Sequence, residues 1–260
     1  MRINTNVSAL NILRNLSNSD QAVQSATEKL SSGFRINRAS DDAAGLAIAN
    51  KLRNTGAALT AAQKNVEQGT AMLQIADGSL QSISTILDRM KELATQYSSA
   101  NTGTDAQANI SAEFDVLKGE IDRTVATTKY EGSDILGQSL AFRIDDTGTA
   151  DDLVTADLSG VTIASTGLDV TDPTTVDTLL TTVNTAIGTV GAAESQLDFA
   201  SKNLSSKAEN TAAAESTIRD ADMAAEMSNY SKSQIISQAG MAILAQANNN
   251  AQGILQLLRA

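Results

Sequence analysis

The sequence contains no cysteine, histidine or tryptophan, and only one proline and four phenylalanines among its 260 residues. Without cysteine there are no disulfides or thiolate ligands, and without histidine there are no imidazole bases or HExxH zinc sites. We therefore expect no catalytic residues, no metal and no cofactor. Because aromatic residues make up only 3% of the chain, aliphatic side chains must form the core, which favours thin helical bundles.

The sequence also lacks the features expected for membrane insertion, for a cleaved leader or for nucleic-acid binding. No run approaches the roughly 20 apolar residues of a membrane span, and MRINTNVSAL lacks the continuous apolar core of a secretory signal. A net charge of −11 argues against nucleic acid as a partner. The charge is uneven, since residues 1–64 hold eight basic and four acidic residues and the remainder is strongly acidic. Attraction between the N-terminal part of one molecule and the acidic part of another is one alternative to a mixed solvated surface.

Both ends of the chain carry amphipathic patterns that predict helices over about 3–32 and 223–258. Their apolar positions recur mostly at steps of three or four, which places them on one stripe of each helix. In the first segment these positions are Ile3, Val7, Leu10, Leu13, Leu16, Val23, Ala26 and Leu30. In the second they are Met223, Met227, Tyr230, Ile236, Ala239, Ile243, Ala247, Ala251, Ile254 and Leu258. We predict that the two helices pair through these stripes and that the pair also contacts neighbours.

Two heptad seams predict long helices between the ends. The first, in a helix over about 42–98, comprises Val66, Leu73, Leu80, Leu87 and Ala94. The second, in a helix that begins at Pro173, comprises Val176, Val183, Val190, Leu197 and Leu204. Two later positions of the second seam are polar, Glu194 and Ser201, and a polar seam residue costs stability while fixing register. A third helix is expected over about 104–129.

Helix ends follow from local signals. Gly33 predicts the end of the first helix, because glycine readily takes the left-handed conformation there. Ser40 is the expected N-cap of the second helix, Thr104 that of the third, and Asp172 that of the fourth. Residues 209–222 are small and polar and predict a break before the terminal helix.

Residues 131–171 change in character. Leu140, Phe142 and Ile144 alternate with polar or small residues, as do residues 154–158, so two strands joined by the turn DTGTADD are predicted, with a third short edge at 161–164. The clustered aspartates leave a calcium site open as an alternative. The turn lacks the spaced ligands and closing glutamate of an EF-hand, which favours a solvated hairpin tip.

Five motifs together resemble bacterial flagellin. They are, in order, MRINTNVSALNILRNL, EKLSSGFRINRASDDAAGLAIANKLR, LDRMKELATQ, SQAGMAILAQAN and ILQLLR. The resemblance covers about 1–135 and 172–260. The outer variable domains of larger flagellins are absent, and the hairpin region stands in their place.

The predicted fold is mainly α, a long antiparallel helical bundle or coiled coil built from both chain ends, with a small β-hairpin region in the middle. Residues 1–41 plus 212–260 are expected to form the inner, tube-forming domain. Residues 42–139 plus 171–211 are expected to form a helical bundle, of which 140–170 is the β-hairpin part.

The resemblance implies a structural subunit that polymerises into the extracellular flagellar filament for motility, exported unfolded by the flagellar type III route. Its implied partners are further copies of itself, the filament cap and hook-associated proteins, and an export chaperone at the C-terminal helix. Nucleic acid and membrane insertion are not implied. A hook–filament junction protein shares similar terminal helices and stays as the alternative.

Assembly is expected to involve the apolar stripes at both chain ends. Amphipathic terminal helices without partners are marginal and present apolar surface, so we hypothesise that they are mobile in the free subunit and become ordered on assembly. The contacts must be head-to-tail, because only a heterologous interface makes an open helix. The predicted assembly residues are Ile3, Val7, Leu10, Leu13, Ile243, Ile254, Leu257 and Leu258. For each one alone, contact within the subunit is an equal alternative.

The resemblance also implies a contact surface for Toll-like receptor 5 on the bundle. The matching positions are Arg89, Leu93 and Gln96 in LDRMKELATQ and Glu113 in SAEF. The first three are spaced by four and three residues, which predicts one shared helix face. Packing against neighbouring subunits is the competing use of that face, and we expect both.

Overall fold

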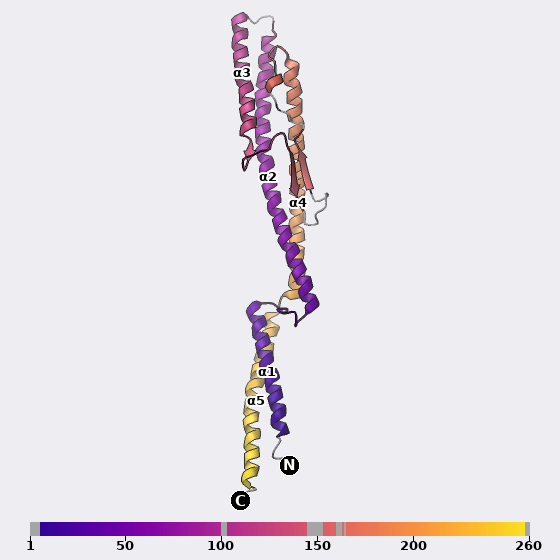
Figure 1. The fold of residues 1–260 in the computed structure, drawn as a ribbon, viewed down its shortest axis with the longest axis vertical. Coiled ribbons are helices and arrows are strands. Elements are labelled where there is room, and N and C mark those ends of the chain that lie inside the picture. The colour runs from indigo at the N-terminus through magenta and orange to yellow at the C-terminus, as the bar shows by residue number, and fades with distance from the viewer. Residues whose placement is uncertain (1–5, 100–102, 145–152, 160–162, 164, 258–260) are drawn as a thin grey trace. The chain divides into compact units, whose positions relative to one another are not determined.

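The computed structural model describes residues 6–99, 103–144, 153–159, 163 and 165–257, with side chains described as far as Asn249. The chain forms two compact units, of which the first comprises residues 1–54 and 211–260 and the second residues 55–210. The mainly helical fold class is confirmed (Figure 1). That the first unit forms a tube and the second surrounds it stays a prediction.

The second unit is an antiparallel bundle of segments from α2 (Ala43–Tyr97), α3 (Thr104–Thr127) and α4 (Pro173–Arg219) (Figure 1). Lys91 pairs with Asp177 at 2.6 Å near one end of the α2–α4 interface, and Gln63 donates to Ser205 near the other. All ten predicted heptad residues of the two seams are buried in one hydrophobic core. The heptad prediction is therefore confirmed, because the 3.5-residue repeat keeps the same face toward the partner helix.

Short strands lie between α3 and α4. β3 (Ser139–Arg143) and β4 (Leu153–Asp157) pair antiparallel, with Leu140 opposite Ala156, which confirms the two predicted strands. A smaller pair, β1 (Lys129–Tyr130) and β2 (Ser133–Asp134), was not predicted. A short 3-10 turn, η2 (Ser165–Gly167), precedes α4. Most of the predicted third edge and the whole DTGTADD turn, with its alternative calcium site, lie outside the described residues.

The hairpin approaches α2 at Gly69. A Cβ added to Gly69 would lie 2.7 Å from Cδ1 of Phe142 on β3 and 3.0 Å from its Cγ. By contrast, a Cβ added to Gly78 in the same helix meets nothing within 4 Å. The absence of a side chain therefore permits close packing at Gly69, whereas no such contact requires glycine at position 78.

The first unit contains α1 (Val7–Ser32), α5 (Met223–Leu257) and the adjoining ends of α2 and α4. Gly33 ends α1 with φ of 75°, as predicted. The carboxylate of Asp222 begins α5 by accepting hydrogen bonds from the backbone N–H groups of Ala224 and Ala225. Searched over the described residues, the chain contains no helix with the length and apolarity needed to cross a membrane.

Three predicted helix boundaries are wrong. α4 continues to Arg219, so the break expected over 209–222 is confined to residues 220–222; the segment AENTAAAEST is rich in alanine, the strongest helix former. Asp42, rather than Ser40, caps α2 by accepting the Gly45 N–H at 2.9 Å. Gly103, rather than Thr104, is the N-cap of α3.

Glu194 interrupts the α4 seam. Its Oε1 atom is buried and has no hydrogen-bond partner within the part of the chain that the structure describes. Burial raises the pKa of the Glu194 carboxyl above its ordinary value, and the Asp77 carboxylate of α2 raises it further. The polar seam position therefore costs stability when it is ionised.

We expect Gly69→Ala to lower the free energy of unfolding by about 1–3 kcal/mol, because the Phe142 ring must move away from the new methyl group. The matched variant Gly78→Ala should instead raise it by up to about 1 kcal/mol, since alanine is the better helix former and space is open. Urea denaturation of both variants measures the difference. Equal effects of the two substitutions would contradict the packing at Gly69.

We expect Glu194→Gln to raise the free energy of unfolding at pH 7 by about 1 kcal/mol, because it removes a buried, unpaired charge. The folded-state pKa of Glu194 is raised, so the native protein binds this proton more tightly and is more stable when Glu194 is protonated. The stabilisation from the bound proton is lost as the pH rises through the raised pKa. The gain in unfolding free energy of the variant over the unchanged protein should therefore become smaller as the pH falls toward 4.5, the ordinary pKa of glutamate. Denaturation across pH 4–8 tests this, and parallel pH profiles would contradict it.

Candidate assembly surface

The interface between α1 and α5 is made of small and polar residues as much as apolar ones. Apart from Glu28 and Lys29 near its end, the buried or half-buried positions of α1 are Ala9, Ile12, Leu16, Ser19, Val23, Ala26 and Leu30. Those of α5 are Glu226, Tyr230, Ser233, Ser237, Gly240, Leu244 and Ala247. Both sets recur at steps of three and four, as in a coiled-coil seam.

Three contacts place the two helices antiparallel. Lys29 and Glu226 lie 4.0 Å apart, and Ser237 donates to Asp20 at 2.8 Å. Gly240 lies against Leu16, whose Cβ is 4.0 Å from the position of a Cβ built on Gly240. The predicted pairing of the chain ends is therefore confirmed.

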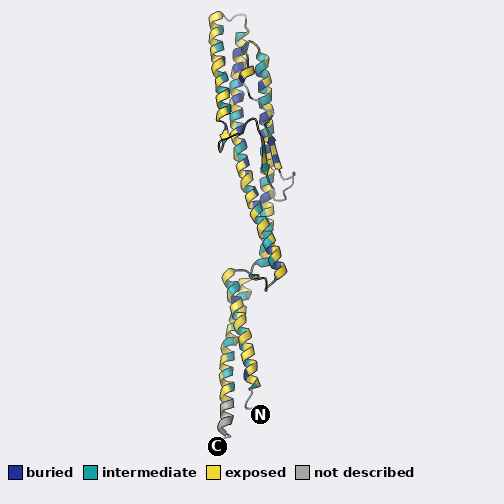
Figure 2. Cartoon of the chain, viewed as in Figure 1, coloured by how far each residue is buried: buried dark blue, intermediate teal, exposed yellow. Residues whose placement is uncertain are grey.

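The predicted apolar stripes, however, do not all face the partner helix. Leu16, Val23, Ala26 and Leu30 of α1 do so, whereas other members of the stripes are exposed (Figure 2). The exposed large apolar residues of the two helices are Val7, Leu10, Leu13, Met223, Met227, Ile235, Ile236, Met241 and Ile243. The physical reason is that two paired helices bury only the narrow strip of positions that recur at steps of three and four, which leaves the flanks of each stripe outside.

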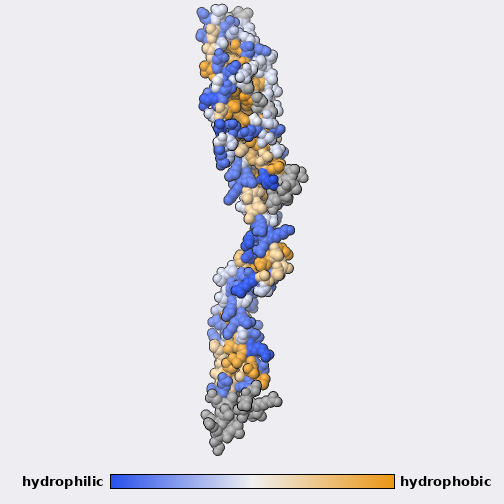
Figure 3. Space-filling model, in the orientation of Figure 1, coloured by the Kyte–Doolittle hydropathy of each residue, from blue (hydrophilic) through white to orange (hydrophobic). Residues whose placement is uncertain are grey.

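Among the predicted assembly residues, Val7 is 60% exposed, Leu10 53%, Leu13 46% and Ile243 55%. Ile3 and Leu258 lie outside the described residues, as do the side chains of Ile254 and Leu257. Ile235 and Met241 are also exposed but were not predicted, although both are large apolar residues in the terminal amphipathic segment. Figure 3 shows apolar surface gathered on the α1·α5 pair, close to the residues drawn in grey.

The first unit has little core of its own. All residues of the hydrophobic core cluster belong to the second unit. Within the described part of the first unit, the buried apolar residues are Ala9, Ala26, Ile36 and Ala49. A helix pair that buries mainly alanine and exposes leucine, isoleucine and methionine has the surface of a protein that binds a partner.

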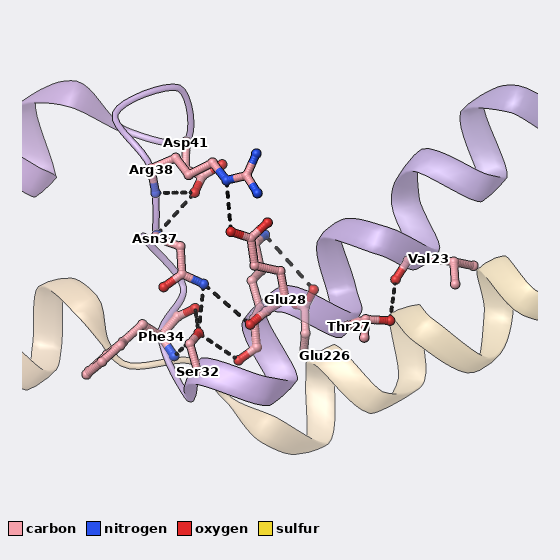
Figure 4. Close-up of polar contacts among 10 residues, drawn as sticks. Val23, Thr27, Glu28, Ser32, Phe34, Asn37, Arg38, Asp41 and Glu226 are labelled. Carbon is pink, nitrogen blue, oxygen red and sulfur yellow. Dashed lines mark hydrogen bonds and ion pairs between the residues drawn. The ribbon is translucent and has the colours of Figure 1, made fainter.

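The connector between α1 and α2 is ordered by polar contacts (Figure 4). Asn37 donates to Ser32 Oγ at 2.7 Å, and Arg38 pairs with Glu28 at 2.8 Å. The Asp41 carboxylate accepts the backbone N–H groups of Asn37 and Arg38. The hydrogen bond from the Arg38 N–H, followed by that from Asn37, holds the pKa of Asp41 below its ordinary value.

The predicted receptor residues do not form one exposed face. Arg89 donates to Glu113 through Nε and Nη2, at 3.0 and 2.8 Å, and to Glu92 through Nη1. The hydrogen bond to Glu113, and then that to Glu92, raises the pKa of Arg89 above its ordinary value. Gln96 is exposed. Leu93 lies in the same helix at the predicted spacing, but it is only 1% exposed and belongs to the core, so the receptor role of these residues stays a prediction.

No cluster of three or more acidic, histidine or cysteine side chains able to hold a metal occurs among the residues that the structure describes. What the described residues of α1 and α5 present is a set of exposed leucine, isoleucine and methionine side chains on two paired helices.

Comparison with known proteins gives two family matches. Residues 3–141 match the model of the bacterial flagellin N-terminal helical region, and residues 174–258 match that of the C-terminal helical region. Flagellins of Halalkalibacterium halodurans and Bacillus subtilis are 40% and 38% identical to the chain, each over 100% of both proteins. A flagellar filament 33 kDa core protein of Treponema phagedenis is 35% identical, also over 100% of both.

Proposed function

This chain belongs to the bacterial flagellin family, and we propose that the exposed apolar flanks of α1 and α5 are the surface through which its copies join. As a family member it is a structural subunit of the flagellar filament, an extracellular appendage, and not an enzyme. The relatives are named for the flagellin and the filament core, and nothing favours the hook–filament junction alternative.

One observation supports this proposal above the others: the two helices pair with each other and still expose Val7, Leu10, Leu13 and Ile243. Burying a large aliphatic side chain contributes about 1.5–3 kcal/mol, so several such residues from each copy supply a substantial driving force. An open helical polymer requires head-to-tail contacts between unlike surfaces. We propose that the two helices become fully ordered only when copies cover these residues.

The further partners follow from family membership. We propose that the same exposed flank of α5 is covered by an export chaperone before assembly, because apolar surface of this extent favours association while the chain awaits export. Export by the flagellar type III route, and contacts with the cap and hook-associated proteins at the filament ends, belong to the same proposal.

We expect Ile243→Asp to prevent or strongly slow seeded polymerisation, because it places a charge in the apolar contact and charge burial is costly. Deletion of 241–260 should abolish filaments altogether. The measurement is electron microscopy of purified subunits incubated with filament seeds.

Gln238→Asp is the matched control, since Gln238 is an exposed polar residue of the same helix. It should polymerise like the unchanged protein. Filaments from the truncated chain would overturn the role of α5, and short caps or rings in place of filaments would favour the junction alternative. Strong hydrogen-exchange protection of α1 and α5 before assembly would contradict ordering on assembly.

We also propose that the exposed side chains around Arg89 and Glu113 contact an innate immune receptor of the Toll-like receptor 5 type when the subunit is free. Arg89 pairs with Glu113 and with Glu92, which leaves a cation and two carboxylates at the surface, and Gln96 of the same helix is exposed. Arginine is common among residues that dominate binding energies. In the filament, the same side chains are available to neighbouring subunits.

Arg89→Ala in the free subunit should reduce receptor activation at least about tenfold, because it removes the cation that the two carboxylates hold at the surface. Arg123→Ala is the control, because Arg123 forms a comparable exposed pair with Glu120 on α3. Circular dichroism should show both variants folded. Leu93→Ala is unsuitable, because truncating a buried leucine costs about 2–5 kcal/mol of stability. Full activation by the Arg89 variant would reject this surface.

A further inference from the structure

A compact set of contacts ties the end of α1 to the junction between α4 and α5. The Ala221 N–H donates to the Gly33 carbonyl at 2.9 Å, and the Arg35 N–H donates to the Arg219 carbonyl at 2.7 Å. Phe34 and Asp220 form an antiparallel bridge between these two bonds. The Arg35 guanidinium adds a bond to the Ile218 carbonyl at 2.7 Å. Two segments nearly 190 residues apart in sequence are thus joined like a short piece of sheet.

Side chains cover this join. The Arg219 guanidinium carbon lies 4.0 Å from the centre of the Phe34 ring, which is a close cation–π contact. The Arg219 side chain is only 15% exposed and is also 3.6 Å from Glu215. Its Nε atom is buried without a hydrogen-bond partner among the described residues. Arg219 is therefore held by stacking on Phe34 more than by hydrogen bonds of its own. We refer to residues 33–35 and 218–221 as the clasp.

Apart from the polar contacts Lys29–Glu226 and Ser237–Asp20, the α1·α5 seam specifies its register weakly. Four of its α5 positions, Ser233, Ser237, Gly240 and Ala247, are small, and large interlocking side chains are what distinguish one register from the next. A slip of one heptad would move α5 by about 10 Å while keeping the same face toward α1. Such a slip would separate the exposed Leu10 and Leu13 of α1 from Met241 and Ile243 of α5.

We propose that Phe34 and Arg219 are positioning residues for assembly, whose clasp fixes the axial register of α1 against α5. The clasp lies immediately after α1 and immediately before α5, where α1 ends at Ser32 and α5 begins at Met223. Because one end of the helix pair is pinned there, the remaining turns can meet in only one alignment. The exposed apolar residues of the two helices then form one continuous face. This inference rests on the proposed assembly function of that face.

Engineered disulfides measure the register directly, because the chain contains no cysteine of its own. The L16C/G240C pair reports the observed register, since a Cβ at position 240 lies 4.0 Å from that of Leu16, within the range of disulfides. The L16C/A247C and L16C/S233C pairs report slips of one heptad in either direction. Each pair is oxidised in free subunits and in filaments, and the cross-linked fraction is quantified by mass spectrometry.

In the otherwise unchanged protein we expect the L16C/G240C pair to dominate. Phe34→Ala and Arg219→Gln should each raise the share of slipped cross-links at least about threefold and slow polymerisation. Phe34→Tyr, which keeps a ring for Arg219 to stack on, should keep the share of slipped cross-links of the otherwise unchanged protein. Arg14→Gln is the matched charge control, since Arg14 is an exposed cation of α1 outside the clasp, and it should leave the ratio unchanged.

An unchanged cross-link ratio in both Phe34→Ala and Arg219→Gln would overturn the clasp proposal, even if polymerisation slowed, because a general loss of stability would account for that. Failure of the unchanged protein to form filaments would instead overturn the proposed function. The two failures are distinguishable because the cross-link ratio is measured in the free subunit as well as in the polymer.

Discussion

The close, largely small-residue contact between α1 and α5 is the constraint on which the assembly surface depends. Gly240 lies against Leu16, and the seam also contains Ser19, Ser233 and Ser237. Two paired helices bury only one narrow strip of each, whatever residues form it. The flanks therefore keep leucine, isoleucine and methionine exposed, and we propose that their burial by other chains supplies the free energy of assembly.

The two units differ in how they are stabilised, and this matches their expected roles in a filament subunit. The second unit encloses a continuous core from Leu59 to Leu204, into which the hairpin residue Phe142 also packs. Because of this core, we expect the second unit to stay folded in a free subunit. The first unit buries little beyond alanines, and its geometry depends on the clasp and on polar contacts such as Lys29–Glu226. One chain thus combines a unit with a large core and a unit with a small one.

Polar contacts in the bundle contribute less to its stability than the apolar core does. The exposed pair of Arg89 and Glu113 joins α2 to α3, and such surface pairs contribute little to stability. The charged groups of such a pair are nevertheless exposed to other molecules. Glu194 shows the opposite case: its partly buried carboxylate opposes stability at neutral pH, while the surrounding valines and leucines hold the seam together.

The sequence by itself determined the mainly helical class, the two heptad seams, the β3–β4 alternation and the left-handed end of α1 at Gly33, because each of these follows from periodicity or from a local conformational preference. The family resemblance also depended on sequence alone. Periodicity could not divide the terminal stripes into inward and outward members, since Leu13 and Leu16 obey the same spacing and only the position of the partner helix separates them. Spacing likewise gave no sign that Leu93 is buried while Arg89, four residues before it in the same helix, is exposed. The stacking of Arg219 on Phe34 was decided by tertiary structure alone, because residues so distant in sequence leave no local signal of their contact.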